Sequence, residues 1–287
     1  MRRSPFVIGS AAALLLVAVS GCRIAPKEQL VFEDNSPPPQ TASRDWKGET
    51  ITIHNEGIDD GVNDPSELGG IEVIVSSTAT RVSVVAIFAA HADDDKPGNA
   101  GLSIADAKKT LGIAETATSF DVTCGHGETH GTARGVGSGC KLLRVTIPAG
   151  NAAMPHALVV DGGSGFVRVG RAESTDAPHV KSIVIHSNGV DDVDVRARPV
   201  KDATLAIEGR DRVTVALPGD FSAKSVLFSV ASADGSEVGS AVVATDFPGM
   251  TSGSAYPASA PSADAITELN VHSTGPSAPG VIKIAKF

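Results

Sequence analysis

Apolar and polar residues alternate with a period of two along most of the chain after residue 49. Successive side chains of a β-strand point to opposite faces, so each alternating run predicts a strand with one face in a core and the other in water. Turn-forming pairs such as Asn188-Gly189 separate the runs. The pattern predicts an all-β fold. The clearest runs are 71–73, 120–124, 143–147, 193–197 and 213–217.

The spacing between the runs predicts how the strands are arranged. Alternate runs start 22, 20 and 21 residues apart, from 183 to 205, from 193 to 213 and from 205 to 226. A near-constant step of this size is typical of a β-solenoid with two strands in each turn. A β-sandwich with a strand every 8 to 12 residues, roughly, is the alternative. Because only 4% of the residues are aromatic, thin stacked coils are favoured over a thick sandwich core.

One segment has the pattern of a short helix. Ser103 and Asp106 have the spacing of an N-terminal cap, which predicts a helix over 103–111. Its apolar residues would share one stripe: Ile104, Ala107 and Leu111. Farther along, the stretch 248–262 is dense in Pro, Gly, Ser and Ala and predicts a flexible surface loop.

The N-terminus has the organisation of a bacterial lipoprotein signal peptide. Arg2 and Arg3 precede an apolar run over 6–19 that is too short to span a membrane comfortably. The run ends in Val19-Ser20-Gly21-Cys22, which resembles the lipobox, where the Cys thiol receives a diacylglycerol before cleavage. We therefore expect residues 1–21 to be removed and Cys22 to carry the lipid, in preference to an ordinary secreted protein with a Cys near its cleavage site.

Charge and the residues that follow Cys22 refine this location. Without residues 1–21 the chain keeps 22 basic and 33 acidic residues, a balance of −11, and it has no basic block, so a nucleic-acid partner is not expected. Arg23, in place of Asp, favours delivery to the outer membrane. Residues 22–48 predict an acylated, Pro-rich tether, and 49–287 a β-rich domain. The expected partners are the membrane, through the lipid, and an envelope or extracellular polymer or protein.

Several segments resemble a family of bacterial envelope proteins, the putative adhesins, which look like short β-helices. A strand ending in Pro and Gly at 143–150 carries the resemblance, together with Gly-plus-alternating-Val stretches at 165–169 and 189–195 and a similar stretch at 213–221. The resemblance covers about residues 49–247. It implies a β-helix-like fold at the cell surface, and the family offers no catalytic residues to transfer. The paired cysteines depart from the family pattern.

The cysteines offer the most reactive chemistry in the sequence. After lipidation of Cys22, only Cys124 and Cys140 remain as thiols. Both lie in stretches that predict adjacent antiparallel strands, and export would expose them to disulfide-forming catalysts, so we expect a Cys124–Cys140 disulfide. A zinc site that adds His126 and His130 is the weaker alternative.

No other stretch forms a recognisable reaction centre. The acidic clusters near Asp59, Asp93 and Asp191 do not have the register of a calcium-binding EF-hand loop. We therefore expect no cofactor and no enzymatic activity, and a non-catalytic cell-envelope lipoprotein that presents its β-solenoid for adhesion or scaffolding. The alternatives are an enzyme acting on envelope glycans, which requires paired carboxylates in one groove, and a calcium or small-ligand binding module.

Overall fold

A computed structural model of the chain describes residues 30–34, 37–58, 69–92, 97–127, 137–162, 165–170, 177–187, 193–209, 212–219, 223–231, 242–245, 266–274 and 281–287. Within these residues the strands form two mixed sheets, which are called sheet A and sheet B below. The lipid-attachment residue Cys22, the signal segment 1–21, His130 and the predicted loop 248–262 lie outside them. No helix in the described part is both long and apolar enough to cross a membrane.

The order of strands in each sheet shows how the chain is wound. Sheet A runs in the order β1 (Leu30–Asp34), β5 (Ser83–Ala92), β8 (Gly137–Pro148), β4 (Gly70–Ser76), β10 (Val167–Val169), β12 (Val193–Arg196), β14 (Arg212–Leu217), β18 (Val281–Lys286) and β16 (Val242–Thr245), with β2 (Gln40–Thr41) beside β5. Sheet B runs in the order β17 (Ile266–Thr274), β15 (Ala223–Ala231), β13 (Arg198–Gly209), β11 (His179–Ser187), β9 (His156–Gly162), β3 (Thr50–Asn55), β7 (Ser119–Cys124) and β6 (Gly112–Glu115).

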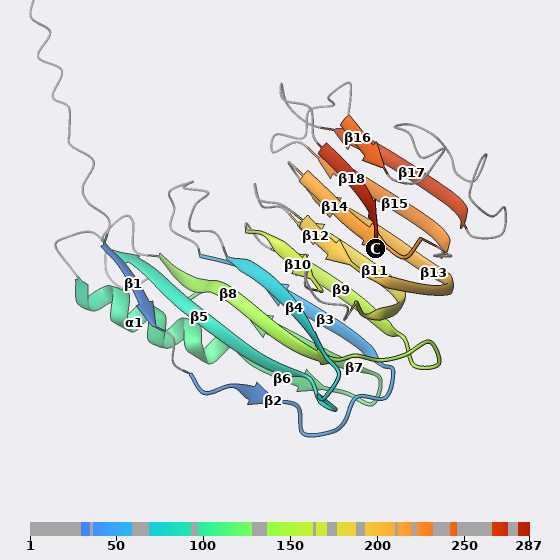
Figure 1. Ribbon diagram of the computed structural model, residues 1–287. Coiled ribbons are helices and arrows are strands. Elements are labelled where there is room, and N and C mark those ends of the chain that lie inside the picture. Colours follow the sequence, from blue (N-terminus) through green and yellow to red (C-terminus); the bar gives the residue numbers. More distant parts are fainter. Residues whose placement is uncertain are drawn as a thin grey trace, which may run out of the picture.

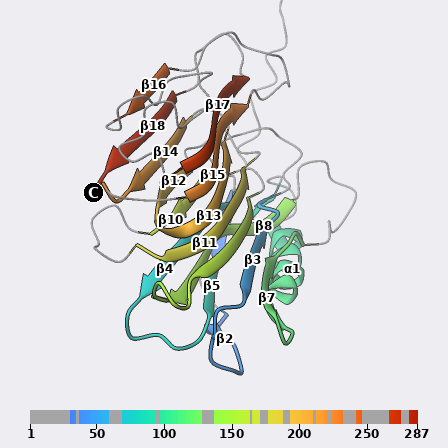
Figure 2. The same cartoon turned by 90° about the vertical axis from the view of Figure 1, so that its right-hand side faces the viewer.

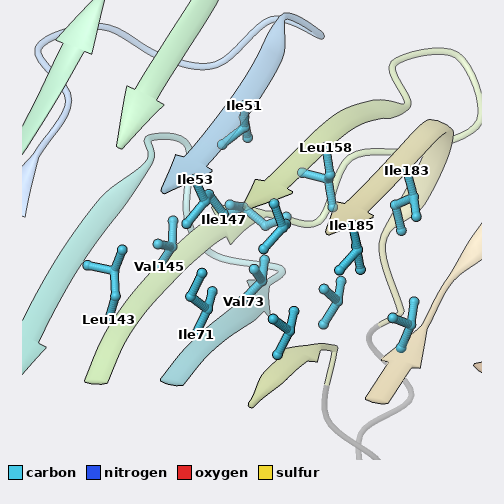
Figure 3. Packing of buried hydrophobic residues seen from close by; sticks show 14 of the residues in the cluster. Ile51, Ile53, Ile71, Val73, Leu143, Val145, Ile147, Leu158, Ile183 and Ile185 are labelled. Atoms are coloured by element: carbon cyan, nitrogen blue, oxygen red, sulfur yellow. The ribbon is translucent and has the colours of Figure 1, made fainter. Parts of the chain in front are cut away.

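The two sheets face each other, and their inward side chains make one core (Figures 1 and 2). The alternation in the sequence explains which residues point inward. In β14, for example, Val213, Val215 and Leu217 are fully buried, whereas the residues between them are partly exposed. Figure 3 shows Ile51 and Leu158 of sheet B lying across from Ile71 and Val73 of sheet A. The all-β prediction is confirmed.

Between β9 and β15 the strands of sheet B pair in parallel, and the register is regular after an irregularity between Val180 and Ser182 of β11. Ile183 pairs with Leu205, and Leu205 with Val226, at the spacing that the sequence pattern predicts. In sheet A, Val193 pairs with Val213 in the same way. The chain therefore alternates between the sheets, one strand in each, and stacks every new pair of strands on the preceding pair.

The winding is less regular at both ends of the molecule. The pair β7 and β8 stacks outside β3 and β4, and β18 lies between β14 and β16. Antiparallel pairs also join β5 to β1, β2 and β8, and β6 to β7. Both sheets are consequently mixed rather than purely parallel.

The helix is longer than predicted and begins elsewhere. Helix α1 covers Pro97–Ala107 and continues into a 3-10 turn, η2 (Lys108–Thr110). The predicted cap at Ser103 is wrong, because Ser103 lies inside the helix and is fully buried. Pro97 is the better start signal, since proline is favoured at the first helical position, where its missing N–H removes no hydrogen bond. The predicted stripe is buried: Ile104, Ala107 and Leu111.

Part of the predicted tether is folded onto the sheets. β1 and β2 both precede Glu49 and pair with β5, so the ordered strands begin earlier than the predicted boundary. Trp46 is 7% exposed and stacks on His156, with 4.1 Å between the ring centroids. The guanidinium of Arg44 lies 4.2 Å from the ring centroid of Phe120. Aromatic and cationic side chains in this segment therefore anchor it, which a proline-rich composition does not predict.

Candidate functional site

The outward face of sheet B carries an ordered row of ionisable side chains. Because neighbouring strands are paired in register, His54 of β3 lies beside Asp161 of β9, Asp161 beside His186 of β11, and His186 beside Glu208 of β13. The row thus alternates imidazole and carboxylate along the sheet. We call these four residues the histidine–carboxylate row.

Hydrogen bonds within the row join its members in pairs. His54 Nδ1 lies 3.1 Å from Asp161 Oδ2, and His186 Nδ1 lies 3.2 Å from Glu208 Oε2. The side chains remain accessible, with exposed fractions from 39% for His54 to 58% for His186. The row is therefore an accessible surface of paired imidazole and carboxylate groups.

Two more groups extend the row at the β3 end. The His54 Nε2 atom lies 3.7 Å from one carboxylate oxygen of Glu56, and the His126 Nε2 atom lies 3.7 Å from the other. The backbone N–H of His126 donates a hydrogen bond to Glu56 as well, at 3.1 Å. The loop after β7 is therefore tied to the loop after β3 through one carboxylate.

A less polar row lies beside the histidine–carboxylate row, two residues earlier on each strand. In register across the sheet, it consists of Thr52, Val159, Val184, Ala206 and Leu227. Leu227 is 38% exposed, and Val159, Val184 and Ala206 are each partly exposed. The face of sheet B therefore combines a charged strip with an adjacent apolar strip.

The outward face of sheet A has a charged row of a different kind. Arg144, Glu72, Arg168 and Asp194 lie side by side on β8, β4, β10 and β12. Arg144 Nη2 is 2.8 Å from Glu72 Oε2, and Arg168 Nη1 is 3.9 Å from Glu72 Oε1. This row therefore consists of guanidinium and carboxylate groups and contains no imidazole.

The positions of the carboxylates on sheet B are relevant to the alternative that the protein is an enzyme acting on envelope glycans. Asp161 and Glu208 are two carboxylates on one face with β11 between them, and each is hydrogen-bonded to a histidine. The face is open, and the shallow hollow near the start of β3 is lined by other residues: Lys47, Glu49, Thr50, Thr118 and Lys181. Among the described residues, no group of three or more His, Cys, Asp and Glu side chains is placed to hold a metal ion.

The two cysteines meet across the core rather than within one sheet. Cys124 ends β7 in sheet B and Cys140 lies on β8 in sheet A, so the prediction that they occupy adjacent antiparallel strands is wrong. Both are free thiols and fully buried. They nevertheless contact each other: burial raises the pKa of the Cys124 thiol, and its hydrogen bond with Cys140 raises that pKa further.

Asn55 connects the backbone around the cysteines. It is fully buried and pairs in register with Cys124, and its Nδ2 donates hydrogen bonds to the carbonyl oxygens of Gly70 and Cys140, at 3.1 and 3.2 Å. Gly139 explains the close approach of the chain, because a Cβ at this position would lie 1.8 Å from the carbonyl oxygen of Gly57. The cysteine pair therefore lies in a corner of the fold where the Asn55 side chain bridges two backbone carbonyl groups and the chain packs closely at Gly139.

His126, one of the weaker metal candidates, lies close to this corner. Its side chain is 35% exposed, but its Nδ1 atom is buried and has no hydrogen-bond partner. Its contact is with Glu56, and no metal-binding group in the described residues includes it.

His156 is a buried histidine that the sequence did not single out. It is fully buried, neither ring nitrogen has a hydrogen-bond partner, and it stacks on Trp46. Burial lowers the pKa of His156 from 6.5 to about 4, although the nearby carbonyl groups of Pro148 and Ala149 oppose the shift. The imidazole is therefore neutral at pH 7.

Alternation in the sequence predicts several of the strands that carry the two charged rows, but not β9 and not the rows themselves. His54, Asp161, His186 and Glu208 are far apart in the chain and share no motif. One signal was present: each of these residues lies one position before the last residue of its strand, at the same point in the alternating pattern. Only the strand register brings them side by side.

The chain matches no known family and no curated protein. Among solved structures, it is similar to a putative cell adhesion protein from Clostridium sporogenes, at 11% identity and a TM-score of 0.41, covering 88% of this chain and all of the other. It is also similar to a putative adhesin from Bacteroides fragilis, at 12% identity and a TM-score of 0.26, covering 87% of this chain and 98% of the other. Similarity at this level does not establish a shared fold or function.

Proposed function

We propose that this protein is a non-catalytic lipoprotein of the cell envelope, which presents a short β-solenoid as a surface for adhesion or scaffolding. The observation that carries the proposal is the pair of open sheet faces, each with an in-register row of charged side chains crossing several strands. Such rows form an extended surface whose side chains are positioned by the backbone before any partner arrives, which reduces the entropic cost of binding.

Parallel register supports the solenoid. The strands that pair across β11, β13 and β15 are separated by 22 and 21 residues, and those across β12 and β14 by 20. A coil with one strand in each sheet has this connectivity, whereas the antiparallel strand pairs lie at one end of the stack, around β5 and β6.

Location at the envelope rests on the N-terminal sequence. The lipobox-like run ending at Cys22 supports acylation there. Two acyl chains on a glyceryl group, with a third on the amine, would hold the protein far more firmly than the marginal anchoring of a single chain. Arg23 supports outer-membrane delivery.

The location is tested by expressing the full chain in a Gram-negative host with a palmitate analogue. We expect label on the wild type and none on Cys22→Ala, with the labelled protein in the outer-membrane fraction. Equal labelling of the two proteins would overturn the lipoprotein assignment.

The binding role is tested on cells that display the protein, using immobilised envelope glycans and extracellular matrix proteins as probes. The Arg144→Gln and Arg168→Gln double variant removes two cations from sheet A without changing the core. We expect wild-type cells to be retained on at least one probe and double-variant cells to be retained less. If wild-type cells adhere to none of the probes, the result contradicts an adhesive role.

A further inference from the structure

The order of charges in the histidine–carboxylate row is self-complementary. Along the sheet the row reads His54, Asp161, His186, Glu208. Reversed, it reads carboxylate, imidazole, carboxylate, imidazole. A second copy laid over the first in reversed order would therefore place every imidazole opposite a carboxylate. Any alternating row with an even number of members has this property, whereas a row of one charge sign does not.

We propose that the face of sheet B is a pairing surface for a second copy of this chain, in a two-fold symmetric dimer. The symmetry axis would run parallel to the strands, between β9 and β11. It would place His54 opposite Glu208 of the partner subunit and Asp161 opposite His186 of the partner subunit. Homodimers with this isologous symmetry are the commonest soluble oligomers.

The same axis pairs the centre of the neighbouring row with itself. It places Val159 of one copy opposite the partner's Val184 and Thr52 opposite the partner's Ala206, whereas Leu227 lies opposite the partner's Asp121. Face-to-face sheets keep their strand directions within about 30° of each other and lie about 10 Å apart, a distance that these side chains can fill. An axis perpendicular to the strands would instead place each histidine opposite its own copy.

The charges around each histidine determine how pairing depends on pH. Within one copy, His54 is faced by Asp161 on β9 and by Glu56, while Asp121 lies one row away on β7; Glu56 also contacts His126. His186 lies between Asp161 and Glu208. In the dimer each imidazole gains a carboxylate of the partner subunit, which favours its protonated form. Pairing should consequently strengthen as pH falls through the range in which histidine titrates, as long as the carboxylates stay ionised.

This pairing identifies a partner for one face of the proposed display protein and depends on that proposal for its biological setting. The measurement uses only the purified full chain in excess non-ionic detergent. If no dimer forms, the proposed envelope location and the adhesive role of sheet A are unaffected. If the protein is instead located in the cytoplasm, the proposed dimer is unaffected.

Sedimentation equilibrium at about pH 5.5 and about pH 7.5 tests the dimer. We expect the apparent dissociation constant to be at least about tenfold lower at the acidic pH, a difference near 1.4 kcal/mol. Glu72→Gln on sheet A is the matched control and should behave as the wild type. A chain that is monomeric at both pH values, or a dimer with no dependence on pH, would overturn the proposal.

Two charge-swapped variants make the geometry testable. The Asp161→Lys and Glu208→Lys double variant has a wholly basic row at acidic pH, and the His54→Glu and His186→Glu double variant has a wholly acidic row. We expect neither to pair with itself and the two to pair with each other when mixed. Because all four side chains are exposed, we expect both variants to fold, and circular dichroism checks this. Failure of the folded variants to pair with each other would also overturn the proposal.

Discussion

The middle of the stack and the end that contains β5 are held together in different ways. From β9 to β15, strands repeat in parallel register, and their inward apolar side chains stack on one another. Around β5, β6 and α1, antiparallel strands, a helix and single polar contacts close the core instead. In the repeated part, each strand pairs with its neighbours in the sheet, so we expect its stability to be nearly a sum of similar interfaces. In the end that contains β5, β6 and α1, stability depends on particular residues.

The largest expected effect compares a buried phenylalanine from each region. Phe228 of β15 and Phe88 of β5 are both fully buried. We expect Phe228→Ala and Phe88→Ala each to lower the free energy of unfolding by about 3–5 kcal/mol, because each leaves a cavity in the core. Urea denaturation measures the loss.

The same pair distinguishes the two regions by hydrogen exchange. We expect Phe228→Ala to reduce amide protection mainly in β13, β15 and β17, with β5 and β8 little affected. Phe88→Ala should reduce protection in β5, β8 and α1. Uniform loss of protection across both sheets in each variant would mean that the two regions unfold as a single unit.

Acid should destabilise the end that contains Trp46. Because the pKa of His156 is lowered from 6.5 to about 4 in the folded state, the unfolded chain binds more protons between these pH values. The loss of stability due to His156 should begin as pH decreases below about 6.5 and level off below about 4, amounting to about 3 kcal/mol. Thermal unfolding measured across this range tests the prediction.

The matched variants are His156→Phe, which keeps a ring against Trp46, and His186→Gln on the exposed face. His156→Phe should reduce the acid-dependent loss, whereas His186→Gln should leave it unchanged. The assignment fails if both variants retain the full loss.

The predicted disulfide would stabilise the end of the stack that contains β7 and β8. Cys124 and Cys140 contact each other but belong to different sheets, so a bond between them would join the two layers. For a loop of this length the chain-entropy model gives about 3 kcal/mol. Oxidised glutathione would accept two electrons and two protons from the thiols and leave as two glutathione molecules. Because both thiols are fully buried, oxidation should occur during refolding and not in the native protein.

Thiol titration of the denatured, unreduced protein measures the outcome. After refolding with oxidised glutathione we expect no reactive thiol from this pair and a higher midpoint in urea than for Cys124→Ala with Cys140→Ala. Two reactive thiols would exclude the bond.

Removing a surface ion pair between β4 and β8 of sheet A should have the smallest effect. Glu72 pairs with Arg144 and is near Arg168 on the exposed face of sheet A. Exposed pairs contribute about 0–1 kcal/mol, so Glu72→Gln should change the urea midpoint little. A loss comparable with that of Phe228→Ala would show that the outward rows, and not only the core, hold the stack together.

The sequence by itself determined the all-β class, the strands of the repeated region and the step between them, because a period of two and a constant spacing are local properties of the chain. It also indicated the stripe of the helix through Ile104, Ala107 and Leu111. The start of that helix was misplaced, since Ser103 has the local chemistry of a cap while its actual position is buried inside α1.

Only the tertiary structure decided the rest. The sheet to which β7 and β8 each belong, the contact between Cys124 and Cys140, and the stacking of Trp46 on His156 depend on residues distant in the chain. The histidine–carboxylate row is the clearest case. Each of its members occupies an ordinary outward-facing polar position of an alternating strand. The row exists because parallel register aligns four such positions across neighbouring strands.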